Sequence, residues 1–216
     1  MDRSVAPPDP FAALPESLRP LARRGEIKRF VKGRRLIEEG EFGDTLFIIL
    51  TGRLKVFSTD DRDREVIFGI HGPGSYLGEM SLDGGPRSAS VIALEASTCV
   101  IVTRQTLRDH IAAEPEFAFE LLSRVIHRAR LATRGLRSMA LLDVYGRMVQ
   151  LLTELSALQV DGTRLMDDRP THAELASRIG CSREMVSRLL KDLETGSYIR
   201  IEGKRLVIIR PLPHRW

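Results

Sequence analysis

Five polar or charged side chains gather in the stretch GCSREMVSRLLKDLE, residues 180 to 194: Arg183, Glu184, Ser187, Arg188 and Lys191. At about 100° per residue, an α-helix would place all of them within one arc of roughly 140°. An arginine can donate two hydrogen bonds to guanine, and a glutamate can accept one from cytosine, whereas serine and lysine suit phosphates. Such a helix could therefore read base pairs. The alternative is a solvated surface helix with ion pairs between successive turns.

A second group of residues lies in GSYLGEMSLDGGPRSASV, residues 74 to 91. Gly78 and Glu79 precede a short helical piece, and a Gly-Gly-Pro turn then presents Arg87, Ser88 and Ala89. Exposed backbone N–H groups, a guanidinium and a hydroxyl suit a phosphate, and a nearby carboxylate suits a ribose hydroxyl. The alternative is a loop between strands with a structural ion pair between Glu79 and Arg87.

Capping signals predict how the stretch 180 to 194 is positioned. Thr171 and Glu174 form a capping box that starts one helix, and Gly180 ends it. Ser182 can cap the next helix, which Gly196 ends. Two helices joined by a three-residue turn that contains glycine form a helix-turn-helix, whose second helix enters the major groove of DNA.

The segment YIRIEGKRLVII then predicts two strands around a glycine turn, which is a β-wing. We expect Thr171, Ser182 and the wing residues Lys204 and Arg205 to contact the DNA backbone, which fixes register without reading sequence. For Lys191, the solvated surface alternative stays open.

Residues 26 to 104 have a different character. Eleven of the 17 glycines lie between Gly25 and Gly85, and short β-rich pieces such as TLFIIL, GRLKVFS and CVIVT run between them. Short strands with closely spaced turns predict a compact all-β sandwich or barrel.

A helix is predicted from Glu116 to about Met139. Its small and apolar residues recur at spacings of four and three, at Ala118, Leu122, Val125, Ala129, Ala132, Leu136 and Met139. This heptad seam buries itself best against a second copy, so it favours a parallel homodimer with flanking arginines at 124, 128, 130, 134 and 137. The alternative is one amphipathic helix packed on its own β domain. A further helix is expected over 141 to 158, followed by a polar loop.

Composition sets the remaining limits. Hydrophobic residues make up 43% of the 216 residues and charged residues 29%, which is ordinary for a globular protein. The net charge of +4 comes from residues 171 to 216, where nine basic side chains face five acidic ones. A basic C-terminal module suits a polyanion. The sequence has no apolar run long enough for a membrane span, its first 20 residues hold five prolines instead of a signal peptide, and its two cysteines are far apart. We therefore expect a cytoplasmic protein with a loose N-terminal lead-in before a short helix.

In this order, these features resemble the cyclic-AMP receptor protein / FNR (Crp/Fnr) family of bacterial transcription regulators, from about Phe30 to Pro211. The motifs GEMSLDGGPRSA, GCSREMVSRLLKDLE and IEEGEFGDTLFIILTGRLKVF carry the resemblance. It implies an α+β fold with three parts: a cyclic-nucleotide-binding-like β-roll (jelly-roll) sensor domain over 1–112, a dimerisation helix over 113–140, and a winged helix-turn-helix DNA-binding domain over 141–216.

The resemblance also implies roles for the residues of the second group. Gly78 and Glu79 would contact the ribose, and Arg87 to Ala89 the cyclic phosphate, while Arg128 and Thr133 on the dimer helix would close over the purine. Two departures matter: the loop from Glu79 to Arg87 is shorter than in the best-known cyclic-AMP binders, and Ala132 has no hydroxyl. Cyclic AMP is the first choice, with another cyclic nucleotide as the alternative.

Other sensory branches of the family fit less well. Its oxygen sensors carry an N-terminal cysteine cluster, and the N-terminal segment of this sequence has no cysteine. A haem sensor needs axial ligands, for which His71 is a weak candidate because a lone histidine in a turn is usually solvated. His110 and His127 are expected on helix surfaces, and Cys181 in the turn of the helix-turn-helix.

We therefore expect a homodimeric regulator that binds palindromic half-sites in double-stranded DNA and works with RNA polymerase. No cofactor is required, a cyclic nucleotide is the allosteric ligand, and no metal, membrane or enzymatic role is expected. The alternatives are a ligand-independent regulator with a vestigial sensor site and a nucleotide-binding signalling module.

Overall fold

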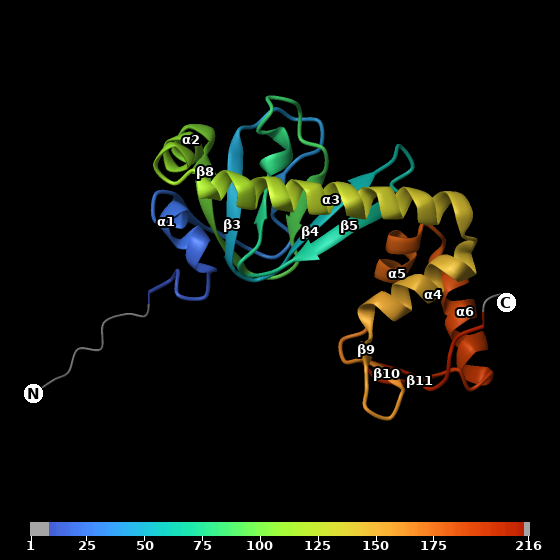
Figure 1. The fold of residues 1–216 in the computed structure, drawn as a ribbon. Helices are drawn as coiled ribbons and strands as arrows, with labels where there is room; N and C mark the ends of the chain where they lie inside the picture. The colour runs from blue at the N-terminus through green and yellow to red at the C-terminus, as the bar shows by residue number, and fades with distance from the viewer. Residues whose placement is uncertain (1–8, 214–216) are drawn as a thin grey trace, which may run out of the picture. The chain divides into compact units, whose positions relative to one another are not determined.

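The computed structural model describes residues 9–213, so the start of the proline-rich lead-in lies outside the described part. Residues 9–58 and 67–129 form one compact unit, and residues 59–66 and 130–213 form a second (Figure 1). The division falls within one continuous helix, between Ala129 and Arg130. The three-part division at residues 112 and 140 stays a prediction.

Two four-stranded sheets form the β-roll, which belongs to the first unit except for the end of β4 and the start of β5 within residues 59–66. The orders are β1-β8-β3-β6 and β2-β7-β4-β5. Their strands are β1 (Glu26–Phe30), β2 (Arg35–Ile37), β3 (Thr45–Thr51), β4 (Leu54–Thr59), β5 (Glu65–His71), β6 (Tyr76–Leu77), β7 (Ser90–Ala93) and β8 (Ser97–Thr103). The prediction of an all-β sandwich in this region is confirmed.

Strand β3 shows how the sequence builds two layers. Leu46, Ile48 and Leu50 belong to a core with the helices of this unit. Phe47 and Ile49 belong to a second core with residues of β4 and β7 in the other sheet. Since successive side chains of a strand point to opposite faces, a run buried on both faces must be almost entirely apolar.

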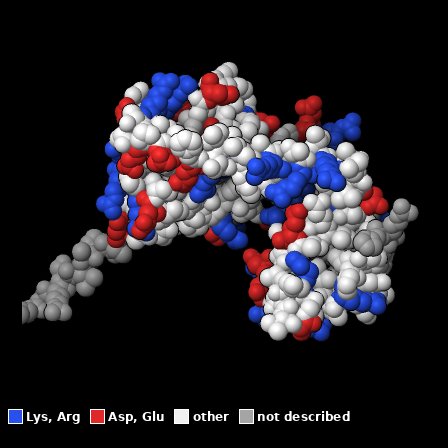
Figure 2. Space-filling view, in the orientation of Figure 1, with Lys and Arg blue, Asp and Glu red and all other residues white. Residues whose placement is uncertain are grey.

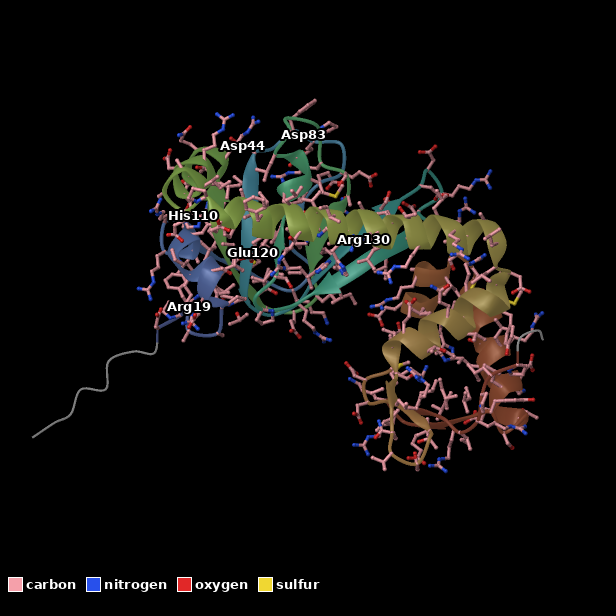
Figure 3. The ribbon with its side chains drawn as sticks, viewed as in Figure 1. Arg19, Asp44, Asp83, His110, Glu120 and Arg130 are labelled. Atoms are coloured by element: carbon pink, nitrogen blue, oxygen red, sulfur yellow. The ribbon has the colours of Figure 1, made fainter. Side chains whose placement is uncertain are left out.

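Short helices cover the outer face of the first sheet. They are η1 (Glu16–Leu18), α1 (Arg19–Ala22) and α2 (Arg104–Ala113). Helix α1 confirms the short N-terminal helix that the sequence predicts. A further short helix, η2 (Glu79–Ser81), lies in the loop after β6. His110 lies on α2 (Figure 3), and the prediction that it is a surface residue is wrong. Its side chain is fully buried against the ring of Phe117, with 4.9 Å between the ring centroids. Burial lowers the pKa of His110. His127 is exposed, as expected.

Helix α3 (Glu116–Leu141) exposes an apolar stripe. Phe119, Leu122 and Leu136 are 67%, 52% and 73% exposed. The arginines predicted to flank the seam divide into two sets. Arg124 and Arg128 contact the β-roll, whereas Arg130, Arg134 and Arg137 are exposed, and basic side chains gather along the C-terminal half of α3 (Figure 2).

The second unit packs three helices against a four-stranded sheet of order β11-β12-β10-β9. The helices are α4 (Val144–Leu155), α5 (His172–Ile179) and α6 (Arg183–Thr195), and the strands are β9 (Ala157–Leu158), β10 (Arg164–Met166), β11 (Ile199–Glu202) and β12 (Arg205–Ile208). The winged helix-turn-helix is therefore present as predicted. Among the described residues, no helix is long and apolar enough to span a bilayer.

Two predictions for residues 141 to 170 need correction. The helix expected over 141 to 158 begins only at Val144, because Oδ1 of Asp143 caps it by accepting from the Gly146 amide at 2.7 Å. The helix also ends earlier than expected, at Leu155, and its expected last residues form strand β9. The expected polar loop holds strand β10, since Leu165 pairs with Val207 of β12 and with Ala157 of β9. The alternation Arg-Leu-Met was too short a signal for a strand.

Candidate functional site

Arg87 is the anchor of the candidate ligand site in the first unit. Its side chain is buried, and its guanidinium donates to the carbonyl and hydroxyl oxygens of Thr45 at 3.0 Å each, to the Gly78 carbonyl at 3.0 Å and to the Ser81 hydroxyl at 2.8 Å. Burial lowers the pKa of Arg87, and the nearby carboxylate of Asp44 opposes that shift (Figure 3). Four protein oxygens, from the start of β3 and from the loop after β6, therefore fix the cation.

The glycine at position 78 is required by its backbone and by its neighbours. Its φ is +97°, in the left-handed region that side chains rarely adopt. An added Cβ would lie 2.5 Å from the Thr45 carbonyl oxygen and 2.7 Å from Nη1 of Arg87. Any side chain here would displace the arginine, so Gly78 supports the site through its shape.

Glu79 is 4% exposed and forms an ion pair with Arg128 of α3. The ion pair of Glu79 is therefore with Arg128, and not with Arg87 as the structural alternative expected. The other carboxylate oxygen, Oε2, is buried and has no hydrogen-bond partner among the described residues. Burial raises the pKa of Glu79, and Arg128 opposes this. A buried acceptor without a donor is costly, and a ligand hydroxyl could satisfy it.

The N-terminal half of α3 is fastened to β6 by its arginines. Arg128 donates to the Tyr76 carbonyl at 2.8 Å, and the Arg124 guanidinium lies over the Tyr76 ring, 4.5 Å from its centroid. His71, at the end of β5, was expected to be solvated, but it is half-buried. Burial lowers its pKa to about 4, with a contribution from the charges of Arg128 and Arg124. Three arginines around one carboxylate make this region suitable for an anion.

The remaining predicted ligand residues differ in their positions. Ser88 is exposed, with its hydroxyl 3.7 Å from the sulfur of Met80, and Ala89 is half-buried beside it. Both immediately follow Arg87, so the structure brings them together with it. Thr133 is exposed on the part of α3 that belongs to the second unit. The ligand roles of all these residues stay predictions.

Capping determines the start of both helices of the helix-turn-helix. The amide of Glu174 donates to Oγ1 of Thr171 at 3.2 Å, and the amide of Met185 donates to Oγ of Ser182 at 3.2 Å. Gly180 ends α5 with a φ of +68°. The hydroxyl of Thr171 donates to the Glu174 carboxylate at 3.0 Å, so a phosphate contact by Thr171 would have to replace that bond.

Helix α6 separates its faces as predicted. Val186, Leu189, Leu190 and Leu193 are buried. The candidate reading residues Arg183, Glu184, Arg188 and Lys191 are exposed, and Ser187 is half-buried. Cys181 packs against the core of this unit in the turn before α6, as expected. The geometry allows a groove-reading role, which stays a prediction.

The two wing residues predicted to meet phosphates already have acidic neighbours. Nζ of Lys204 lies 3.6 Å from Asp168, and Nε of Arg205 lies 3.1 Å from Asp167. All four side chains are more than half exposed, so these pairs contribute little and could be exchanged for phosphates.

Sequence reasoning missed His172, the first residue of α5. Its Nδ1 lies 2.8 Å from the hydroxyl of Ser187 on α6. The capping box placed residue 172 at a helix start, but the contact depends on how the two helices cross, which the spacing of residues does not give.

The fold defines a class of protein, in which a β-roll is combined with a winged helix-turn-helix. Residues 27–114 match the cyclic nucleotide-binding domain family, and residues 146–212 match the Crp-like helix-turn-helix domain family. The chain belongs to the Crp/Fnr family of transcription regulators.

Relatives extend over nearly the whole chain. The CRP-like cAMP-activated global transcriptional regulator of Mycobacterium tuberculosis is 33% identical over 205 residues, which cover 93% of this chain and 88% of the relative. The cAMP-activated global transcriptional regulator CRP of Salmonella typhimurium is 32% identical over 187 residues, covering 84% of this chain and 89% of the relative.

Solved structures show the same fold. The c-di-GMP responsive global regulator CLP of Xanthomonas campestris has a TM-score of 0.76 at 24% identity, covering 89% of this chain and 97% of that one. The catabolite activator protein of Thermus thermophilus has a TM-score of 0.55 at 28% identity, covering 93% of each chain.

Proposed function

We propose that this chain acts as a homodimer that binds DNA sequence-specifically and that a cyclic nucleotide, cyclic AMP first, controls its affinity for DNA. The observation that carries the ligand part is that the site holds both a buried cation fixed by protein oxygens, Arg87, and a buried carboxylate, Glu79, with one oxygen that has no donor among the described residues. The two curated relatives described above are both named as cAMP-activated regulators.

The ligand would contact this region through two chemical groups. Its phosphate would accept hydrogen bonds from Arg87 and the exposed Ser88, and a ribose hydroxyl would donate to Oε2 of Glu79. Its base would lie toward α3, where Arg128 already binds Glu79. A ligand that changes the contacts of α3 can shift the protein from an inactive arrangement toward one that binds DNA. The size of this shift is set by the difference between the ligand's affinities for the two arrangements.

The ligand-independent alternative also has a supporting observation. Buried Arg87 and half-buried Arg128 already have protein partners, so neither cation needs a nucleotide to satisfy it. In that case, the first unit would have only a structural role.

One experiment separates these readings. The full chain would be used to select duplexes from a random library without nucleotide and with cyclic AMP, cyclic GMP or cyclic di-GMP, and calorimetric titrations would use the same three nucleotides. The proposal expects palindromic sites whose enrichment depends on one nucleotide. Enrichment indifferent to all three would establish the ligand-independent reading, and no enrichment would refute the DNA-binding function. The family implies RNA polymerase as the partner of the bound dimer, in the cytoplasm.

Assembly is tested by a charge in the seam of α3. Leu136 is 73% exposed and apolar, and in a parallel dimer it would face its own copy across the two-fold axis. Leu136→Glu and Ala129→Glu should therefore give monomers, because two buried like charges without partners cost several kcal/mol, about 3 or more. Ser123→Glu, at an exposed position on the opposite side of the helix, is the matched control. Sedimentation that finds both seam variants dimeric would contradict the assignment.

A further inference from the structure

His172 and Ser187 connect the two helices of the helix-turn-helix. His172 begins α5, Ser187 lies midway along α6 between the reading residues Arg183 and Lys191, and the imidazole Nδ1 is 2.8 Å from the serine hydroxyl oxygen. The same hydroxyl lies 3.1 Å from the carbonyl oxygen of Arg183. The imidazole therefore lies at the edge of the candidate reading face.

These two distances determine which nitrogen of His172 carries the proton. A serine hydroxyl has one hydrogen, and the Arg183 carbonyl can only accept it. The hydroxyl oxygen must then accept from His172, so Nδ1 carries a hydrogen and the neutral ring keeps its lone pair on Nε2. The lone pair on Nε2 would repel a phosphate oxygen, whereas a protonated Nε2 would donate a hydrogen bond to it.

Burial and the charges around His172 favour its neutral form in the free protein. Burial lowers its pKa, and the two charged groups that act on it, Arg169 before α5 and Arg183 on α6, are cations that lower it further. The acidic neighbour on its own helix, Glu174, is engaged by Thr171 in the capping box. Nε and Nη1 of Arg169 are buried without a partner among the described residues, so positive charge beside the ring is not neutralised through those two atoms.

We propose that His172 takes up one proton from solvent at Nε2 when the reading face meets DNA, and that it then donates a hydrogen bond to a backbone phosphate. This inference rests on the proposed DNA-binding function of α6 and adds a residue and a pH dependence to it. A phosphate replaces the unfavourable cationic surroundings with a negative partner, which favours the imidazolium. Nδ1 keeps its bond to Ser187 in both states, so the proton adds a contact without moving α6.

The direction of the pH dependence follows from the pKa of His172 in the free protein and in the complex with DNA. The pKa of His172 is lowered in the free protein, and the proposal expects it to be higher in the complex with DNA. At a pH between these two pKa values, the complex therefore holds more protons than the free protein and DNA together. DNA affinity should rise as the pH falls through that window, by up to about tenfold per pH unit, and become flat below it.

The test measures the affinity of the full chain for a selected duplex by fluorescence anisotropy, at constant ionic strength, from about pH 5.5 to 8.5, the range in which histidine titrates. Measurements are made with and without cyclic AMP. Wild type should show the slope, His172→Gln should lose it, and His172→Arg should bind tightly at every pH. His127→Gln, an exposed histidine on α3, should keep the slope.

An NMR titration of the wild-type imidazole provides a reading that needs no variant, since its pKa should rise on adding the duplex. Specific binding with a flat pH profile, or a slope that survives in His172→Gln, would overturn the proton uptake and leave DNA reading intact. If the selected duplex is bound no better than an unrelated duplex at any pH, the sequence-specific DNA-binding function is refuted, and this proposal with it.

Discussion

Arg87→Leu should strongly weaken cyclic nucleotide binding and leave the ligand-independent affinity for DNA unchanged. Four of the five N–H groups of Arg87 already bind protein oxygens, so Nε–H is the one left for a phosphate. A charge-assisted hydrogen bond contributes about 1.5–3 kcal/mol, so its loss weakens binding by about tenfold to a hundredfold. Calorimetric titration with cyclic AMP measures the first effect, and anisotropy with a labelled duplex measures the second.

This substitution also has a structural cost that must be measured separately. Leucine would leave the buried oxygens of Thr45, Gly78 and Ser81 without their donor. Arg87→Lys retains the charge but cannot reach all four oxygens, and Ser88→Ala removes only a hydroxyl from the exposed side of the loop. If thermal unfolding shows that Arg87→Leu is folded and it still binds nucleotide with wild-type affinity, the phosphate site lies elsewhere.

Arg183→Ala and Arg188→Ala should each remove about 1–3 kcal/mol of discrimination at one guanine in every half-site. Both side chains are exposed on α6 and are not part of its buried stripe, so neither change should disturb the fold. By resemblance to the family, the half-site should be close to TGTGA, with a two-fold related copy one helical turn away. A panel of duplexes with single base changes measures the effect.

Lys204→Ala is the matched control for these arginines. The lysine lies in the wing and is expected to meet phosphate, so its loss should weaken all duplexes alike and reduce the salt dependence of binding. If the two arginine variants weaken every duplex by the same factor, then Arg183 and Arg188 also contact phosphates and do not read bases.

The sequence predicts local features well because their signals are local. The capping box at Thr171, the glycine end of α5 and the apolar stripe of α6 each depend on residues within one or two turns. The run TLFIIL in β3 likewise indicates a strand buried on both faces.

Features made by distant residues could not be predicted in the same way. The partner of Glu79 is Arg128, which lies 49 positions away on a helix. His110 looks like a surface residue on α2 until Phe117 of the next helix covers it. Strand β10 is recognised only through its pairing with β12.

The guanidinium of Arg87 is immobilised by protein oxygens before any ligand arrives. A free arginine side chain has about 2 kcal/mol of rotamer entropy, and folding of the β-roll already removes most of it here. Anion binding therefore has little further motion to restrict at this residue. A flexible surface arginine would lose that freedom only on meeting its ligand, so the β-roll transfers an entropic cost from the binding step to the folding step.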